Sequence, residues 1–285
     1  MPAVPTSPVR ILVKGSSTVS WISLVEPGRV SHAYPRALET AMQQHGWSTQ
    51  VRVMSPLAAS SLRILRDADD EIFAWDPDVI VLNTGHMETL HMVIPRAFAR
   101  HVFTRTARPG LWRRAYRRSV LWAVYASATR IQARIEPMVA PWVFRRRRNK
   151  VIAHVNRYIE IAKGNGHPLV IVMGLTPPVL RVPEFPGLVA RLDMMNEAFR
   201  ALVEQRADPS IAWFDPSDAL APDELPPEHV IGDGMHFTAK AHEAVGKRLA
   251  DLVEAWAMQQ PHLISPQAEW PQSRTSSFVP SSDDG

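Results

Sequence analysis

The amino-acid sequence predicts an α/β fold in which a parallel sheet of five strands is covered by helices on both faces. Two observations carry this prediction. Short apolar segments alternate along the chain with longer segments of helical periodicity, as in a doubly wound sheet with right-handed crossovers. Residues 79–83 are apolar almost throughout, as a central parallel strand should be. The predicted strands are 9–14, 49–54, 78–83, 168–174 and 211–214.

Turn and capping residues set the helix boundaries. The segment 34–46 has Pro35 in its first turn and ends at Gly46, which is typical of a helix. The same reasoning predicts a helix over 60–75, which Asp76 and Pro77 close. The other predicted helices are 150–163, which ends at a Gly-Asn-Gly sequence, the amphipathic segment 188–206, and 239–256, which follows Thr238 as N-cap.

Composition suggests one domain with an insertion. The chain has 285 residues, which suits one large domain, here 9–257 with a helical insertion at 91–150. We expect residues 1–8 to be flexible and the Ser- and Pro-rich tail, 258–285, to be disordered. Residues 1–8 lack the basic and apolar regions of a signal peptide, and no apolar run is long enough for a membrane span. The sequence therefore predicts a cytoplasmic protein.

Three polar loops follow predicted strands or precede a helix near the end of the chain: 15–18, 85–88 and 233–236. In parallel sheets such loops meet at the carboxyl edge, where ligands bind. Asp233 and His236 are three residues apart, so the carboxylate can hold the imidazole in one tautomer and make it a better base. The alternative is that both are ordinary polar residues beside the N-cap of a helix.

These residues resemble the motifs of the SGNH (GDSL) hydrolase superfamily, which contains esterases, lipases and carbohydrate deacetylases. The first motif, Gly-Asp-Ser, corresponds to Gly15, Ser16 and Ser17, and the last motif, Asp-x-x-His, is matched by Asp233 and His236. The resemblance covers roughly 9–90 and 150–257. It implies a flavodoxin-like three-layer α/β/α fold and a catalytic triad of Ser17, His236 and Asp233, with Ser16 as second candidate for the nucleophile.

The resemblance is incomplete at the two motifs that supply the oxyanion hole. Gly85, His86 and Glu88 match the third motif, but Met87 stands where the family has Asn. The second motif, a Gly after the second strand, has no counterpart, and Ala58 is the residue that could provide the backbone N–H. The resemblance implies that Gly85, His86, Ala58 and Glu88 bind the oxyanion or the substrate. His86, Asn83 or the substrate itself could replace the Asn amide, with His86 first among them. For Glu88, capping of the following helix is favoured over a role in the site.

The insertion 91–150 differs in charge from the rest of the chain. It carries 15 Lys and Arg residues and a single acid, Glu136, and large apolar residues lie between the cations. Such segments suit contact with an anionic membrane or a lid over an acyl-binding cleft, whereas the plain alternative is a solvated helical hairpin. Nucleic acid is an unlikely partner because no reader motif accompanies the charge.

Together these observations predict a serine esterase or deacylase acting on an acyl or acetyl ester of a lipid, a sugar or a secondary metabolite. An acyltransferase of the same fold remains an alternative, as does a binding module that uses the basic insertion on anionic surfaces. The histidines show no metal-ligand spacing, and the chain contains no Cys. We therefore expect no metal and no cofactor.

Overall fold

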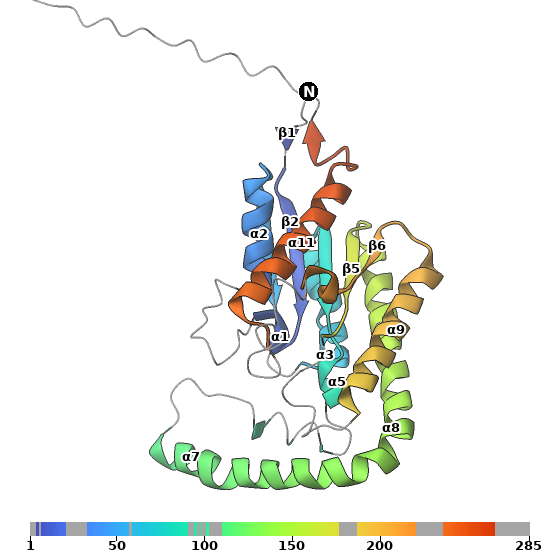
Figure 1. Cartoon of the computed structure of the whole chain (residues 1–285). Coiled ribbons are helices and arrows are strands. Elements are labelled where there is room, and N and C mark those ends of the chain that lie inside the picture. Colours follow the sequence, from blue (N-terminus) through green and yellow to red (C-terminus); the bar gives the residue numbers. More distant parts are fainter. Residues whose placement is uncertain are drawn as a thin grey trace, which may run out of the picture.

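A five-stranded parallel sheet forms the centre of the protein (Figure 1). In the computed structural model its order is β3-β2-β4-β5-β6, and every neighbouring pair is parallel. The strands are β2 (Val9–Gly15), β3 (Thr49–Met54), β4 (Val79–Asn83), β5 (Leu169–Met173) and β6 (Ile211–Phe214). The predicted five-stranded parallel sheet is confirmed. The structure describes residues 4–5, 7–20, 33–56, 59–90, 94–95, 98, 101–102, 110–176, 187–220 and 236–265.

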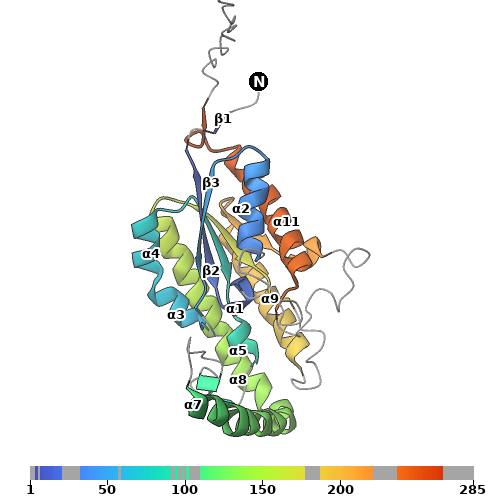
Figure 2. The ribbon, with the colours of Figure 1, turned by 90° about the vertical axis from the view of Figure 1, so that its left-hand side faces the viewer.

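Helices cover both faces of the sheet, so the predicted three-layer α/β/α architecture is also confirmed (Figure 2). One face is covered by α2 (Tyr34–Gln44) and α11 (Ala239–Ala257). The other is covered by α3 (Ser61–Arg66), α4 (Ala68–Trp75), the C-terminal part of α8 (Trp122–Gly164) and α9 (Leu188–Arg206). β4 and β5 are buried at every position because both of their faces are covered.

The short elements lie at the strand ends. α1 (Ser17–Ser20) follows β2, α5 (His86–Leu90) follows β4, and the 3-10 helix η3 (Pro216–Ala219) follows β6. The predicted helix 60–75 is two helices, because Asp67 leaves helical geometry with ψ near 2° and separates α3 from α4.

The two ends of the described chain pair with each other. β1 (Val4–Pro5) and β7 (Ile264–Ser265) form a two-stranded antiparallel sheet. Leu263, beside β7, is buried in the same core cluster as α2 and α11. The segments predicted to be flexible or disordered, 1–8 and 258–285, thus contribute these two strands, while 266–285 lie outside the described part and their disorder stays a prediction.

The basic insertion continues directly into the helical layer. α7 (Leu111–Tyr116), the π-helical segment η2 (Arg117–Leu121) and α8 follow one another without a break, so the predicted helix 150–163 is only the end of α8. Figure 1 shows this helix crossing below the sheet and then turning up along it. Pro137 and Pro141 lie in the interior of α8, and each removes a helical N–H, which is the usual cause of such a bend. From residue 111 to residue 150 the described chain is one continuous helical run and not the two helices of a hairpin, the plain alternative.

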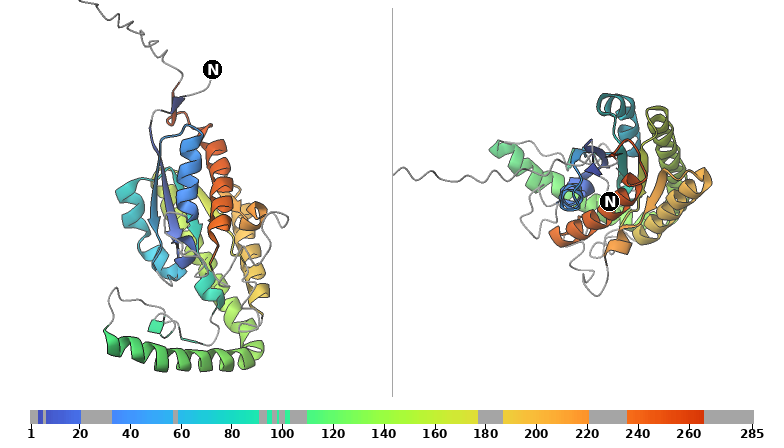
Figure 3. Two further views of the ribbon diagram at one scale, coloured as in Figure 1. Left: turned by 60° about the vertical axis from the view of Figure 1, so that its left-hand side comes forward. Right: turned by 90° about the horizontal axis from the view of Figure 1, so that it is seen from above.

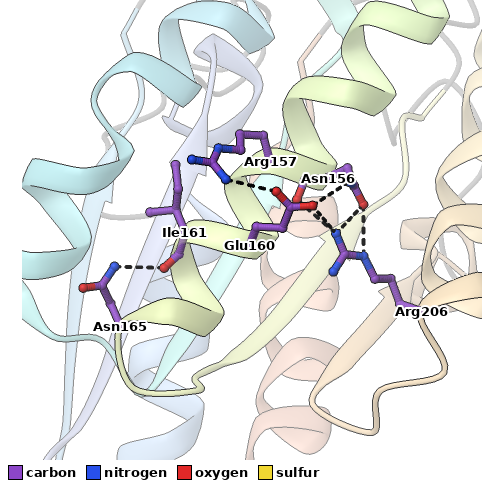
Figure 4. Close-up of polar contacts among 6 residues, drawn as sticks. All are labelled: Asn156, Arg157, Glu160, Ile161, Asn165 and Arg206. Carbon is purple, nitrogen blue, oxygen red and sulfur yellow. Dashed lines mark hydrogen bonds and ion pairs between the residues drawn. The ribbon is translucent and has the colours of Figure 1, made fainter.

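Polar contacts fix the C-terminal part of α8 against the end of α9 (Figure 4). Arg206 Nε and Nη2 donate to Asn156 Oδ1 at 3.0 and 2.6 Å, and Nη2 also donates to Glu160 Oε1 at 3.1 Å. Arg157 contacts the same carboxylate from one turn away, at 3.2 Å. Hydrogen bonds from Arg157 and Arg206 hold the pKa of Glu160 below its ordinary value.

The contact between α2 and α11 depends on Gly246. A Cβ at this position would lie 2.4 Å from Ala37 Cβ and 2.8 Å from Leu38 N, so the two helix backbones approach too closely for any side chain. We expect Gly246→Val to lower the free energy of unfolding by at least about 1–3 kcal/mol, because the added methyls overpack the contact. Urea unfolding followed by circular dichroism measures this.

The matched control is Gly164→Val at the end of α8, where a Cβ would meet no atom within 4 Å. Its stability should change by less than about 1 kcal/mol. Equal losses in the two variants would show that helix propensity, and not the close approach to α2, determines the effect at Gly246.

Candidate active site

Ser17 and His236 meet at the carboxyl edge of the sheet. Ser17 begins α1 directly after β2, and His236 lies two residues before Thr238, whose Oγ1 accepts the Ala241 N–H and caps α11. Ser17 Oγ lies 3.2 Å from His236 Nε2, and both side chains are half-buried. This distance is within hydrogen-bond reach, so the imidazole can accept the hydroxyl proton.

The neighbouring hydroxyls of the first loop point elsewhere. Ser16 is buried, and its Oγ lies 3.3 Å from Thr18 Oγ1. Thr18 Oγ1 in turn donates to Asn83 Oδ1 at 2.7 Å, which joins the end of β2 to the end of β4. Ser17 is therefore the hydroxyl that reaches His236, whereas Ser16 and Thr18 support the turn beneath it.

Two residues of the predicted site lie outside the described residues: Asp233, the predicted third member of the triad, and Ala58, the predicted backbone donor. The residue next to Ala58 is described: Ala59 is buried, and its N–H donates to Pro56 O at 3.1 Å.

Gly85 and His86 form the third loop, whose imidazole is within electrostatic reach of His236. Gly85 has φ of +116°, which an L side chain rarely adopts, and it turns the chain from β4 into α5. Burial and, to a smaller extent, the nearby His236 lower the pKa of His86 to about 4. Its Nδ1 is buried and has no hydrogen-bond partner among the described residues. His86 is therefore neutral at pH 7, with one ring nitrogen carrying a proton.

Glu88 holds the second loop in place. Its Oε1 accepts the Ser61 N–H at 3.0 Å and the Ser61 hydroxyl at 3.1 Å, and Ser61 Oγ lies 2.9 Å from His154 Nδ1. Only 1% of Glu88 is exposed. These contacts connect α5, the start of α3 and α8, so Glu88 fixes the start of α3. A direct contact of Glu88 with substrate, which the sequence resemblance implies, does not fit this burial.

Sequence reasoning missed Ser61 and His154 as partners of Glu88. Ser61 lies at the start of the predicted helix 60–75, which is the only sequence signal for its position. His154 comes from the interior of α8, and nothing in its local sequence links it to α5. Within the described ranges, no group of three or more His, Asp or Glu residues could hold a metal ion.

Comparison with solved structures identifies the class of fold. No protein-family model and no curated protein sequence matches the chain.

Solved structures do match. A carbohydrate acetylesterase from Sinorhizobium meliloti superposes with a TM-score of 0.53 at 14% identity, over 87% of this chain and 99% of that one. A lipase from a goat rumen metagenome superposes with a TM-score of 0.53 at 15% identity, over 85% of this chain and 96% of that one. A GDSL-like lipase from Bacteroides thetaiotaomicron superposes with a TM-score of 0.52 at 11% identity, over 87% of this chain and 89% of that one. The chain has the fold that the sequence resemblance implies.

The low pKa of His86 makes stability depend on pH. Folding favours the neutral ring, so the unfolded chain takes up a proton near pH 6.5 while the folded protein does so only near pH 4. The contribution of His86 to the free energy of unfolding is therefore fully present above pH 6.5. It falls as the pH is lowered, by about 2 kcal/mol at pH 5. Urea unfolding of the wild type and of His86→Gln at pH 7 and pH 5 measures the difference.

His86→Gln cannot titrate, so its loss of stability between pH 7 and pH 5 should be smaller by that amount. Comparing the two proteins cancels the contributions that the carboxylates and the other histidines make to the pH dependence of stability. An identical pH dependence in both would contradict the burial of a neutral ring at this position.

Proposed function

We propose that this protein is a serine hydrolase that cleaves carboxylic esters. The contact of 3.2 Å between Ser17 Oγ and His236 Nε2 is the observation that carries the proposal. It brings a hydroxyl and a base from opposite ends of the chain to the edge where parallel sheets bind ligands. Structures of the same fold include a carbohydrate acetylesterase and lipases, which supports ester chemistry over other uses of a Ser-His pair.

The reaction follows from these positions. Ser17 Oγ attacks the ester carbonyl carbon while His236 Nε2 takes its proton, which gives a tetrahedral oxyanion. Collapse of the oxyanion breaks the ester bond, and His236 returns the proton to the departing alcohol. Water then attacks the acyl group on Ser17 with His236 as base again, which releases the acid. Asp233 is the residue proposed to orient the imidazole through its Nδ1–H.

His86 is the proposed side-chain donor to the oxyanion. Burial and the nearby His236 lower the pKa of His86 to about 4, so its ring is neutral at pH 7. A neutral ring donates a hydrogen bond without adding a second positive charge beside the imidazolium that forms on His236. Asn83 is less suited, because it is only 2% exposed and its amide therefore lies below the surface that a substrate reaches.

The first test removes the nucleophile. We expect Ser17→Ala to lower kcat/KM for p-nitrophenyl acetate by at least about 10³-fold, because it removes the hydroxyl that contacts His236. Ser16→Ala is the matched control, since this hydroxyl contacts Thr18 instead of His236, and it should keep activity within about tenfold. A fluorophosphonate probe should label the wild type and Ser16→Ala but not Ser17→Ala.

A wild-type protein that neither turns over the ester nor reacts with the probe would refute the proposal and would favour a binding module of this fold. If Ser16→Ala is not labelled and Ser17→Ala still is, the nucleophile is Ser16 and not Ser17. Product analysis with an added alcohol separates hydrolysis from acyl transfer.

The second test concerns the oxyanion donor. We expect His86→Ala to lower kcat by about 10²–10³-fold with little change in KM, because an oxyanion donor acts in the transition state. Adding Met87→Asn to His86→Ala supplies an amide at the position where the family carries one, and it should recover at least tenfold of the loss. A loss below about fivefold in His86→Ala would show that His86 only lines the cleft.

A further inference from the structure

Exposed apolar side chains are concentrated on one long helix. We call residues 111–142, which form α7, η2 and the first part of α8, the arm. Nine of the thirteen large apolar residues that are exposed in the described chain belong to it: Leu111, Trp112, Tyr116, Val120, Trp122, Val124, Ile131, Met138 and Trp142. Trp112 is 90% exposed and Met138 is 85% exposed. An exposed apolar surface of this extent is typical of a site that contacts another protein or a membrane.

Within α8 these residues form a stripe. Val124, Ile131 and Met138 are seven residues apart, and Trp142 follows after four more, so they lie along one side of the helix. The side that faces the protein is a different one and contains the buried Leu121 and Tyr125.

The charge around the stripe is entirely positive. Arg130 and Arg134 are exposed and lie beside Ile131 on the helix surface, and the exposed Arg145 and Arg146 follow Trp142. The only acid between residues 91 and 150 is Glu136, which is 1% exposed and forms an ion pair with Arg191. An apolar stripe with arginines at its side and no exposed acid is complementary to anionic phospholipids, because tryptophan and arginine both suit the headgroup region.

A second copy of the chain fits this stripe less well. In a coiled coil a second apolar row lies three positions before the first. Here the members of that row before Trp142 are Leu121, which is buried, and Ala128 and Ile135, which are half-buried. Along most of the stripe only the outer row is therefore exposed, which is too narrow for the two-row contact of a helical partner.

The inner side of the arm is fixed to the helix that carries His86. Gln132, which is fully buried, donates from Nε2 to Leu90 O at 3.4 Å and accepts the Ile94 N–H at 3.3 Å. Arg191, the partner of Glu136, donates from Nε to Thr89 O at 3.0 Å. These buried contacts hold the arm against the C-terminal end of α5, so its outer face has a fixed orientation relative to the site.

The arm crosses the carboxyl edge of the sheet, the edge at which β2 leads into α1 (Figures 1 and 3). We propose that the arm lies flat on an anionic phospholipid bilayer, with its apolar stripe in the headgroup region, and brings the active-site edge to the membrane. On the basis of the proposed ester hydrolysis, the substrate is then an acyl ester of a lipid in that surface.

Vesicle co-sedimentation of the full chain tests the docking. We expect binding to vesicles of phosphatidylcholine and phosphatidylglycerol, and at least tenfold weaker binding to phosphatidylcholine alone. Ile131→Glu with Met138→Glu should weaken binding to the anionic vesicles at least tenfold, because it places two acids in the stripe. Arg130→Gln and Arg134→Gln should each weaken it about fivefold, and added salt should weaken it further.

Phe73→Glu is the matched control, since Phe73 is 80% exposed but lies on α4, and its vesicle binding should equal that of the wild type. Circular dichroism shows that each variant is folded. Vesicle binding that does not depend on phosphatidylglycerol, or that survives Ile131→Glu with Met138→Glu, would overturn the proposal. So would a dimer in analytical ultracentrifugation that this double variant dissociates in the absence of vesicle binding.

The substrate is tested separately from the docking. Ser17→Ala should bind anionic vesicles as the wild type does, so a failure of the proposed hydrolysis leaves the docking result intact. Ile131→Glu with Met138→Glu should keep its rate on p-nitrophenyl acetate but lose at least tenfold on a phospholipid in vesicles. Equal rates of the double variant and the wild type on the vesicle substrate would overturn the membrane-lipid assignment even if the soluble ester is cleaved.

Discussion

The contact between Ser17 and His236 joins residues 219 positions apart, and the candidate site exists only because two helices hold their loops at one edge of the sheet. α1 follows directly after β2, so this strand, which is paired on both sides, fixes the hydroxyl. The imidazole is fixed by α11, which the close approach at Gly246 holds against α2. His242 on α11 adds a second link, because its Nδ1 accepts the N–H of Tyr34 at the start of α2 at 3.1 Å. A shift of α11 along α2 would therefore move His236 away from the nucleophile.

Close to this contact, a buried polar network joins the short helix α5 to its neighbours. The Gly and the Asn that the sequence resemblance leads one to expect after the second and third strands are absent. Glu88 accepts hydrogen bonds from the backbone N–H and the hydroxyl of Ser61, and so ties the start of α3 to α5. Hydrogen bonds to a charged group are worth about 1.5–3 kcal/mol each. This network anchors the start of α3 to α5 at the carboxyl edge of the sheet.

Much of the fold could be predicted from the sequence, since the strands are short apolar segments and the helices are bounded by residues such as Pro35 and Thr238. The length of α8 could not, because two prolines within it suggest a break, whereas neighbouring contacts keep the helix continuous through the bend. At the site, the sequence offers Ser16 and Ser17 after the same strand, and only the three-dimensional arrangement separates them. Lys14 shows the same limit: its strand is predicted as buried, but its ion pair with Glu71 on α4 depends on which helix covers that face.

The short helix α5 belongs to the candidate site and also contacts the arm, so it links a membrane-bound arm to the active-site edge. α5 has five residues, so His86 at its start and Leu90 at its end are about 6 Å apart along the helix axis. Gln132 binds the carbonyl of Leu90, while His86 lies beside His236. A lid that opens and closes would have to break the buried contacts of Gln132 and Glu136 in each cycle, at a cost of several kcal/mol. A fixed arm needs no such motion, and it can direct the active-site edge toward a surface while the geometry of the Ser-His pair remains unchanged.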